Sequence, residues 1–442
     1  MLPPSARYSG QTHAILGMGA SGMAAAQLAR HLGADVVLLD DGPSDKSAAP
    51  AARAEGFVVL TGADALGCGA SFDLAILSPG IDPTWPLAQR VIRMGVPCVS
   101  EIEFAFQQTN VPVIAVTGTN GKTTTTGLIA HLLESAGRRT VPCGNYGTPL
   151  AEVVLGGAAL EVLTVEVSSF QLELIQTFRP VVSVWMNFAA DHLDRHPTLD
   201  SYRAAKQRIF ENQTPADTAV INGAESYPTL AARKITFSAW RDDTDWTLSD
   251  GTIFHRDQPV LQVADTRLRG HHNAENIMAA LAAVTAFGLP LAPAASAVSG
   301  FTPPRHRCEI VATINGREFL NDSKATNIHA MESALRGQER PVVLIAGGKE
   351  KGLDYAPLLP LIRRKTTHVF TIGEIGPALA RSWPGAVTCQ DLESAVHQAY
   401  TAAHPGQAIL FAPGTSSFDM FTGYGHRGDV FCQIVQQLIP TT

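Results

Sequence analysis

The sequence lacks the features of secreted and membrane proteins. Its six cysteines are scattered and include no C-x-x-C pair, which excludes a disulfide framework and a zinc site of the usual spacing. No apolar run approaches about eighteen residues, so we expect no membrane-spanning segment. No charged N-terminal region precedes a long apolar core, so we expect no signal peptide. These absences favour a cytoplasmic enzyme.

The chain also lacks an excess of positive charge. It has 33 Lys and Arg residues against 40 Asp and Glu residues, a net charge of −7, and no alternation of basic with aromatic residues. We therefore expect no nucleic-acid partner, while a local basic pocket for phosphates stays compatible with this composition. The 442 residues suffice for about three domains of ~150 residues each.

The most informative stretch is VIAVTGTNGKTTTT at 113–126. Its first four residues form an apolar run, three of them β-branched, that predicts a buried strand, and an apolar helical pattern follows the glycines. A strand, a glycine loop and a helix in this order make a phosphate cradle. Lys122 would reach the β- and γ-phosphates and Thr123 would face Mg²⁺. Val116 replaces the first glycine of the usual loop, which leaves the shorter pattern G-x-x-G-K-T.

The N-terminal region resembles a dinucleotide-binding βαβ unit. Gly17, Gly19 and Gly22 satisfy G-x-G-x-x-G after a short strand, and Asp40 follows about twenty residues later, at the end of a second strand. This spacing is typical of a site for a pyrophosphate-bearing nucleotide. Glycines that only allow close packing of helix and strand are the structural alternative.

Polar residues follow the later strands at the positions where ligands bind. Glu166 ends a buried strand, where a carboxylate is costly unless it is paired or bound to metal. A group of histidines and aspartates follows the next strand, and its spacing is not that of a zinc site. Lys206, on its own, reads as a surface lysine of a helix over 201–210. Asn273 and Asn276 start an alanine-rich helix and, on chemistry alone, favour a capping role.

The third block again alternates strands with helices. A polar segment, NDSKATN at 321–327, enters a helix, and strands at 342–346 and 408–411 end in glycine, lysine and hydroxyl residues. Such strand ends converge at one edge of a parallel sheet, and lysines and hydroxyls there suit a carboxylate ligand.

Seven segments together resemble the Mur ligases of peptidoglycan synthesis. They are TGTNGKT at 117–123, EVSSFQLE at 166–173, NFAADHLDRH at 187–196, YRAAKQRIF at 202–210, HNAENIMAA at 272–280, HRCE at 306–309 and NDSKATN at 321–327. The resemblance covers essentially the whole chain in the right order. It implies an α/β fold of three domains: a Rossmann-like domain for a UDP-sugar at 1–108, a P-loop-type ATPase domain with a mostly parallel sheet at 109–302, and a Rossmann-like amino-acid domain at 303–442.

Within the family, GMGASG and NDSKATN are similar to the branch that adds glutamate to UDP-N-acetylmuramoyl-L-alanine. APGTSSFDMF resembles that branch's S-P-A-x-x-S-x-D-x-F, with Ala412 and Gly414 as departures. The resemblance implies an ATP-dependent ligase that forms an acyl phosphate, with ATP and two Mg²⁺ ions and without NAD. It also implies UDP-N-acetylmuramoyl-L-alanine and D-glutamate as substrates. We expect a monomer.

The resemblance also implies a role for each matching residue. The residues implied to bind ATP are Gly118, Thr119, Asn120, Gly121, Lys122, Thr123, Thr124, Asn276, Arg307 and Asp322. Those implied to bind the UDP substrate are Gly17, Ser21, Gly22, Asp40, Asn145, Ser168 and Gln171. Those implied to bind glutamate are Lys324, Thr326, Lys351, Ser417 and Tyr424. Those implied to act in catalysis are Lys122, Glu166, His192 and Lys206. Those implied to support metal are Thr123, Glu166, His192 and Lys206, the last as a carbamylated lysine.

Three other interpretations stay open at this point. A related ligase would use another amino acid, for example L-glutamate, because a sequence does not reveal the handedness that a pocket selects. A nucleotide-binding module would keep the fold without ligation. A dinucleotide-dependent oxidoreductase would explain the N-terminal glycines but leave the central loop unexplained.

Overall fold

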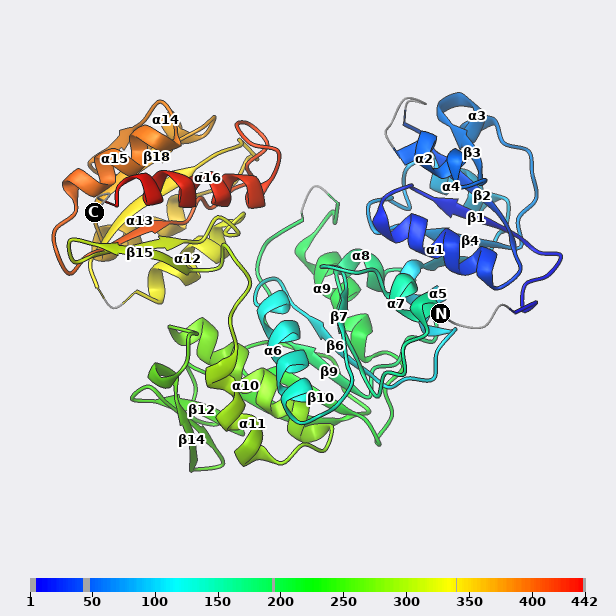
Figure 1. Ribbon diagram of the computed structural model, residues 1–442, viewed down its shortest axis with the longest axis horizontal. Helices are drawn as coiled ribbons and strands as arrows, with labels where there is room; N and C mark the ends of the chain where they lie inside the picture. Colours follow the sequence, from blue (N-terminus) through cyan, green and yellow to red (C-terminus); the bar gives the residue numbers. More distant parts are fainter. Residues whose placement is uncertain (1–4, 43–47, 193–194, 339, 440–442) are drawn as a thin grey trace. The chain divides into compact units, whose positions relative to one another are not determined.

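The computed structural model describes residues 5–42, 48–192, 195–338 and 340–439. Three helix-flanked β-sheets follow one another along the chain, as the sequence predicts (Figure 1). The chain packs into two compact units. The first comprises Met1–Thr247, Phe254–Val260 and Asn276–Val298, and the second comprises Leu248–Ile253, Leu261–Glu275 and Ser299–Thr442. The predicted domain limits at 108 and 302 stay predictions.

The first sheet has the order β3-β2-β1-β4-β5, and all neighbouring strands are parallel. Its elements are β1 (Thr12–Leu16), α1 (Ala20–His31), β2 (Asp35–Asp40), α2 (Ala48–Ala54), β3 (Val58–Thr61), α3 (Gly62–Gly67), β4 (Leu74–Leu77), α4 (Pro86–Arg93), β5 (Cys98–Ser100) and α5 (Glu101–Phe106). The strand order reverses at β1, between β2 and β4. The loops after β1 and β4 therefore meet at the switch point where such sheets bind ligands.

The second sheet has the order β14-β13-β12-β11-β10-β9-β6-β8-β7, with β6 between β8 and β9. The neighbours from β12 to β7 are parallel, and every residue of β6, β8 and β9 is buried, as expected for strands covered on both faces. The helices are α6 (Lys122–Ser135), α7 (Leu150–Gly156), α8 (Ser169–Leu172), α9 (Leu199–Gln207), α10 (His271–Ala286) and α11 (Leu291–Ala297), with short 3₁₀ turns η1 (Arg208–Phe210), η2 (Val263–Asp265) and η3 (Val298–Gly300). The strands are β6 (Val113–Thr117), β7 (Pro142–Gly144), β8 (Leu163–Glu166), β9 (Val182–Trp185), β10 (Thr218–Asn222), β11 (Arg233–Ser238), β12 (Trp246–Ser249), β13 (Thr252–His255) and β14 (Gln258–Gln262).

The third sheet has the order β15-β16-β20-β17-β18-β19 and is parallel except for its β15–β16 edge. Its strands are β15 (Glu309–Ile314), β16 (Arg317–Asn321), β17 (Val342–Gly347), β18 (Thr366–Ile372), β19 (Ala386–Thr388) and β20 (Ala408–Phe411). Its helices are α12 (Ile328–Arg336), η4 (Ala356–Leu358), α13 (Leu359–Lys365), α14 (Gly376–Ser382), α15 (Leu392–Ala402) and α16 (Tyr424–Gln437). The fold class inferred from the sequence is thus confirmed.

Two helices differ from their predicted limits. α9 ends at Gln207 and continues as the 3₁₀ turn η1, so the helix expected over 201–210 is shorter at its C-terminal end. α10 begins at His271, so Asn273 and Asn276 lie inside the helix and the capping role favoured from the sequence is wrong. The reason is that Gly270, whose φ is positive, turns the chain just before the helix. Its carbonyl oxygen accepts hydrogen bonds from the Asn273 and Ala274 amides.

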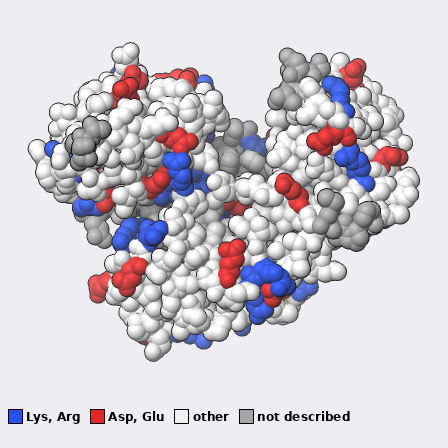
Figure 2. All heavy atoms as spheres, in the orientation of Figure 1, with Lys and Arg blue, Asp and Glu red and all other residues white. Residues whose placement is uncertain are grey.

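None of the helices in the described ranges is long and apolar enough to cross a membrane. On the face drawn in Figure 2, acidic and basic side chains are interspersed among uncharged ones, so neither sign of charge dominates that face.

Candidate active site

The glycine loop between β6 and α6 is folded as a phosphate cradle. Gly121 has φ +86° and immediately precedes Lys122, the first residue of α6. A Cβ on Gly121 would lie 2.5 Å from Asn276 Oδ1, and one on Gly118, with φ +145°, would lie 2.8 Å from Met186 Cβ. Both positions therefore require glycine. The loop leads into the N-terminus of a fourteen-residue helix, which favours an anion.

Two asparagines brace this loop. The Asn187 side chain accepts a hydrogen bond from the Asn120 amide at 2.8 Å and donates one to the Asn120 carbonyl oxygen at 3.1 Å. Asn276, on α10, accepts from the Thr125 hydroxyl at 3.2 Å. The loop shape is therefore fixed by Asn187, which follows β9, and by Asn276 on α10. Asn276 thus lies beside the predicted ATP site.

Glu166 ends β8 beside Thr123. The Thr123 hydroxyl donates to Glu166 Oε2 at 2.7 Å, and the Asn145 amide donates to Glu166 Oε1 at 2.8 Å. A buried carboxylate touching the first helical hydroxyl is an oxygen-only donor set, which is the kind that Mg²⁺ prefers. The structure thus brings together Thr123, Asn145 and Glu166, which lie 21 to 43 positions apart in the sequence.

Lys206 is buried and is not the surface lysine that its local sequence suggests. Its ammonium group donates to the Gly118 carbonyl oxygen at 2.8 Å and lies 4.8 Å from the centre of the Tyr202 ring. Burial lowers the pKa of Lys206 well below its usual value, and the positive charge of Lys122 lowers it further. The nearby carboxylates of Asp191 and Glu166 oppose this shift. A lysine in this setting is readily present as the neutral amine.

His192 lies at the edge of this site. Its backbone is in the left-handed region, with φ +54°, and its ring packs edge-on against Phe170 with the ring centres 4.9 Å apart. Its Nε2 lies 3.9 Å from Asp191 Oδ2, and 43% of its side chain is exposed. His192 is therefore accessible to a ligand. Leu193 and Asp194 of the same motif lie outside the described residues.

The predicted sugar-nucleotide residues Gly17, Ser21, Gly22 and Asp40 lie around the switch point of the first sheet. Gly22 packs against the loop after β1 so closely that a Cβ would come within 2.0 Å of the Gly17 carbonyl oxygen. The Ser78 hydroxyl, after β4, donates to the same oxygen at 3.1 Å. Asp40 Oδ1 accepts from the Gly42 amide at 2.9 Å.

Ser168 and Gln171 form a capping box at the start of α8. Gln171 Oε1 accepts from the Ser168 amide at 3.0 Å, and its Nε2 is buried without a hydrogen-bond partner in the described chain. The pair therefore has a structural role beside the substrate role implied by the resemblance.

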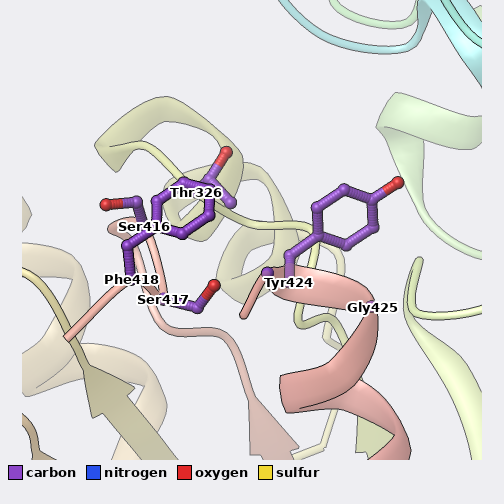
Figure 3. A pocket seen from close by; sticks show the side chains of 7 residues that line it. Thr326, Ser416, Ser417, Phe418, Tyr424 and Gly425 are labelled. Carbon is purple, nitrogen blue, oxygen red and sulfur yellow. The ribbon is translucent and has the colours of Figure 1, made fainter. Parts of the chain in front are cut away.

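In the second compact unit, four of the five predicted glutamate residues lie together. Thr326, Ser417 and Tyr424 line a pocket of about 390 Å³ together with Ser416, Phe418, Gly423 and Gly425 (Figure 3). Lys324 Nζ lies 4.0 Å from the centre of the Tyr424 ring. Hydroxyl groups, an ammonium group and aromatic rings are thus close enough to contact one small acidic ligand. Lys351 is exposed and is not among the residues that line this pocket.

Arg307 and Asp322 belong to the same unit. Asp322 is buried and accepts a hydrogen bond from the Cys308 amide at 3.1 Å. Burial raises the pKa of Asp322 to about 6, while the Cys308 amide and the Arg307 charge lower it.

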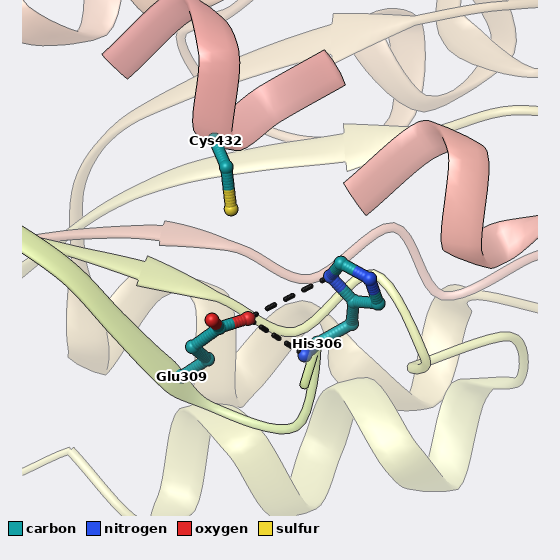
Figure 4. A group of neighbouring side chains, drawn as sticks. All are labelled: His306, Glu309 and Cys432. Carbon is teal, nitrogen blue, oxygen red and sulfur yellow. Dashed lines mark hydrogen bonds and ion pairs between the residues drawn. The ribbon is translucent and has the colours of Figure 1, made fainter. Parts of the chain in front are cut away.

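A further group of metal-type side chains, His306, Glu309 and Cys432, lies beside this segment (Figure 4). Its groups are already engaged. The Asn321 amide lies 2.9 Å from His306 Nδ1 and donates to Cys432 Sγ at 3.2 Å, and the Arg305 guanidinium lies 3.5 Å from Glu309. This network accounts for the cluster without a metal ion.

Sequence reasoning missed Arg427, which is fully buried beneath the pocket loops. It also missed Phe418, which lines the pocket although 69% of it is exposed. For Arg427 a signal was present: an arginine four residues before the apolar Phe431 on α16 falls on the face that packs into the core.

A parallel sheet with a glycine loop, a strand-end glutamate and a buried lysine defines a protein with a phosphate-binding loop. Family models of the Mur ligase middle domain and of the Mur ligase, glutamate ligase domain match residues 116–284 and 306–415. The UDP-N-acetylmuramoylalanine–D-glutamate ligase of Syntrophotalea carbinolica is 40% identical, covering 98% of this chain and 99% of that protein. That of Geobacter metallireducens is 39% identical, covering 97% and 98%. The chain belongs to the Mur ligase family.

Solved structures agree on the fold. MurF ligase from Thermotoga maritima, in complex with ADP, has a TM-score of 0.62 at 15% identity, covering 98% of this chain and 96% of that chain. UDP-N-acetylmuramate-alanine ligase MurC from Thermotoga maritima has a TM-score of 0.60 at 19% identity, covering 97% and 99%.

Proposed function

We propose that this chain is an ATP-dependent ligase that joins D-glutamate to UDP-N-acetylmuramoyl-L-alanine in the cytoplasmic synthesis of peptidoglycan precursors. The near-full-length relatives that bear this name support the choice of substrates. The observation that carries the chemistry is the contact of Thr123 with Glu166, beside the two lysines that donate to the Gly118 carbonyl oxygen of the glycine loop.

The reaction requires activation of a carboxylate, because a carboxylate and an amine do not condense in water at useful rates. An oxygen of the alanine carboxylate attacks the γ-phosphorus of ATP, so that an acyl phosphate forms and ADP leaves. The glutamate amine then attacks the acyl carbon, loses a proton, and phosphate leaves. Lys122 and the loop amides hold the transferring phosphate, so positioning and charge neutralisation provide most of the rate enhancement.

We propose that the site takes two magnesium ions. Thr123 and Glu166 would hold the first, and His192 with a carbamylated Lys206 would support the second. Bound magnesium neutralises charge on the phosphates and on the attacking carboxylate. Carbamylation requires a neutral amine, and the lowered pKa of Lys206 supports this assignment. The carbamate would place a negative charge beside Lys122 where a protonated Lys206 would place a positive one, so an attraction replaces a repulsion.

The remaining predicted residues divide among the substrates. Gly17, Ser21, Gly22 and Asp40 would bind the uridine diphosphate, with Asn145, Ser168 and Gln171 nearer the muramoyl-alanine end. Asn276, Arg307 and Asp322 would contact ADP. Lys324, Thr326, Lys351, Ser417 and Tyr424 would bind glutamate. We propose that the enzyme acts as a monomer and does not use NAD.

Trapping the intermediate tests this proposal. The enzyme is incubated with ATP, Mg²⁺ and UDP-N-acetylmuramoyl-L-alanine without an amino acid, and borohydride is added. An acyl phosphate is reduced to the alcohol, so mass spectrometry should find the alaninol derivative, and Lys122→Ala should not form it. Absence of the alcohol with the intact enzyme, while ADP accumulates, would contradict an acyl-phosphate route.

A further inference from the structure

Arg427, on α16, is a fully buried arginine without a carboxylate partner. It is among the largest completely buried side chains of the described chain, and none of the described acidic groups forms an ion pair with it. Its Nη1 is buried and has no hydrogen-bond partner among the described residues. Arginine is almost never fully buried unless it is paired, so this position calls for a specific reason.

The guanidinium group joins the two loops that carry most of the pocket. Its Nε donates to Ser323 Oγ at 3.0 Å, and its Nη2 donates to the Ser323 carbonyl oxygen at 2.8 Å and to the Thr415 carbonyl oxygen at 3.1 Å. Ser323 directly precedes Lys324, and Thr415 directly precedes the pocket residues Ser416 and Ser417. One planar group therefore fixes the spacing of two ligand-bearing segments.

A third segment packs against the same group. A Cβ on Gly348 would lie 3.0 Å from Arg427 Nη1 and 2.5 Å from the Ser416 carbonyl oxygen, so this glycine admits the guanidinium. The Thr415 hydroxyl donates to the Lys349 carbonyl oxygen at 2.6 Å, and the Lys349 amide donates to the Ser416 carbonyl oxygen at 3.0 Å. The chain that leads to Lys351 is thereby tied to the pocket loop.

The charge on Arg427 is only weakly compensated. Burial lowers its pKa to about 10, while Asp419 and Asp322 raise it, so the group stays charged at neutral pH. The guanidinium donates to the Thr415 carbonyl oxygen, and Thr415 directly precedes the pocket residues Ser416 and Ser417, so this buried charge lies close to the pocket wall. A ligand with two carboxylates would supply the missing negative charge.

We propose that Arg427 is a positioning residue for the amino-acid pocket, holding its three loops in register and favouring a dicarboxylic ligand through its unpaired buried charge. This role rests on the proposed function, because it assumes that the pocket receives the amino acid.

The test measures the KM values for D-glutamate, ATP and the sugar nucleotide in Arg427→Lys, in Arg427→Met and in the parent enzyme. Lysine keeps the charge but cannot span Ser323 and Thr415, so we expect the KM for D-glutamate to rise roughly tenfold. Methionine also removes the charge and should raise it further. The KM values for ATP and for the sugar nucleotide should stay within about twofold, well below the shift of one lost charged hydrogen bond. Arg317→Met is the matched control. Arg317 also donates to a backbone carbonyl oxygen, but it lies at the start of β16, whereas Ser323 follows the end of that strand.

Two results would overturn the proposal. One is an unchanged KM for D-glutamate in both Arg427 variants. The other is a parallel rise of all three KM values with a lower unfolding midpoint, which a general structural role would produce. If both variants fail to fold, Ser323→Ala removes the hydroxyl that accepts from Arg427 Nε and donates to the Tyr424 carbonyl oxygen, and it should raise only the KM for D-glutamate. If the intact enzyme shows no turnover with any amino acid, that result would instead contradict the proposed function. Calorimetric titration of D-glutamate into the same variants would then still test the role of Arg427.

Discussion

Lys122 and Lys206 donate hydrogen bonds to the same acceptor, the carbonyl oxygen of Gly118, at 3.0 and 2.8 Å. Two cations on one oxygen repel each other, and only Lys206 is fully buried. Burial, and after it the charge of Lys122, lowers the pKa of Lys206 well below its usual value, which favours the neutral amine. This pair connects the phosphate loop to the lysine that we propose is carbamylated.

The first prediction concerns that modification. In buffer containing ¹³C-labelled bicarbonate, the intact enzyme should show a carbamate carbonyl resonance in its ¹³C spectrum. Lys206→Arg should lack it, because a guanidinium stays protonated and does not form a carbamate. Lys234→Arg is the control, since Lys234 is exposed and its pKa is raised by the Tyr227 hydroxyl. A resonance that persists in Lys206→Arg would assign the modification to another lysine.

The second prediction concerns the nucleotide loop of the first sheet. Gly22→Ala places a Cβ against backbone, 2.0 Å from the Gly17 carbonyl oxygen, so the loop must shift. We expect the KM for the sugar nucleotide to rise by roughly tenfold or more, the equivalent of about 1.4 kcal/mol. Gly19→Ala is the control, because nothing lies within 4 Å of its Cβ position. Equal effects of the two substitutions would show that the contact with Gly17 is unimportant.

The third prediction separates two lysines of one loop. Lys351→Ala should raise the KM for D-glutamate and leave the KM for ATP unchanged, because Lys351 is proposed to bind a glutamate carboxylate. Lys349 forms an ion pair with Glu374 at 3.1 Å, so Lys349→Ala should change neither constant by more than about twofold, as expected for an exposed pair. Steady-state kinetics would measure both. An unchanged glutamate KM in Lys351→Ala would remove Lys351 from the site.

The fourth prediction uses two glutamates of α5 that differ in their surroundings. Glu101 is fully buried, accepts from the Ala151 amide at 2.6 Å, and has one oxygen without a partner in the described chain. Burial raises its pKa to about 7. The folded state therefore holds this proton more tightly than the unfolded state does, and stability is lost as the pH rises from about 4.5 through about 7.

Glu101→Gln should remove that loss, which is on the order of 3 kcal/mol for a shift of this size. As the pH rises from 5 to 8, the unfolding midpoint of the intact enzyme should therefore fall relative to the unfolding midpoint of the Glu101→Gln variant. For Glu103, burial opposes ionisation, but hydrogen bonds from Thr177, Gln176 and Gln107 outweigh it and lower the pKa. Glu103→Gln should therefore show no such pH-dependent difference over this range. A difference for Glu101→Gln that does not vary with pH would contradict the raised pKa.

Much of the fold follows from the sequence because it depends on local patterns. The apolar run before Gly118 predicts β6, and the glycine spacing after β1 predicts a Rossmann-like turn. Helix ends were harder to place, since they depend on contacts outside the segment. Asn273 looks like a cap, yet α10 starts two residues earlier at His271, where Gly270 turns the chain.

Site residues could be predicted from the sequence where they belong to a motif that matches a family. They could not be predicted where their role depends on being buried by the folded chain. The local sequence around Lys206 favours an exposed lysine, whereas the fold buries it against Gly118. Arg427 carries no motif, and only the folded chain brings it between Ser323 and Thr415. Contacts between segments about a hundred residues apart do not appear in any local pattern.

The most direct test of the proposed function is phosphate release with ATP and UDP-N-acetylmuramoyl-L-alanine. D-glutamate, L-glutamate and other amino acids are supplied in parallel reactions. We predict release with D-glutamate and none above background with L-glutamate or the others. Release only with another amino acid would contradict the choice of substrate, and no release with any of them would contradict ligase activity.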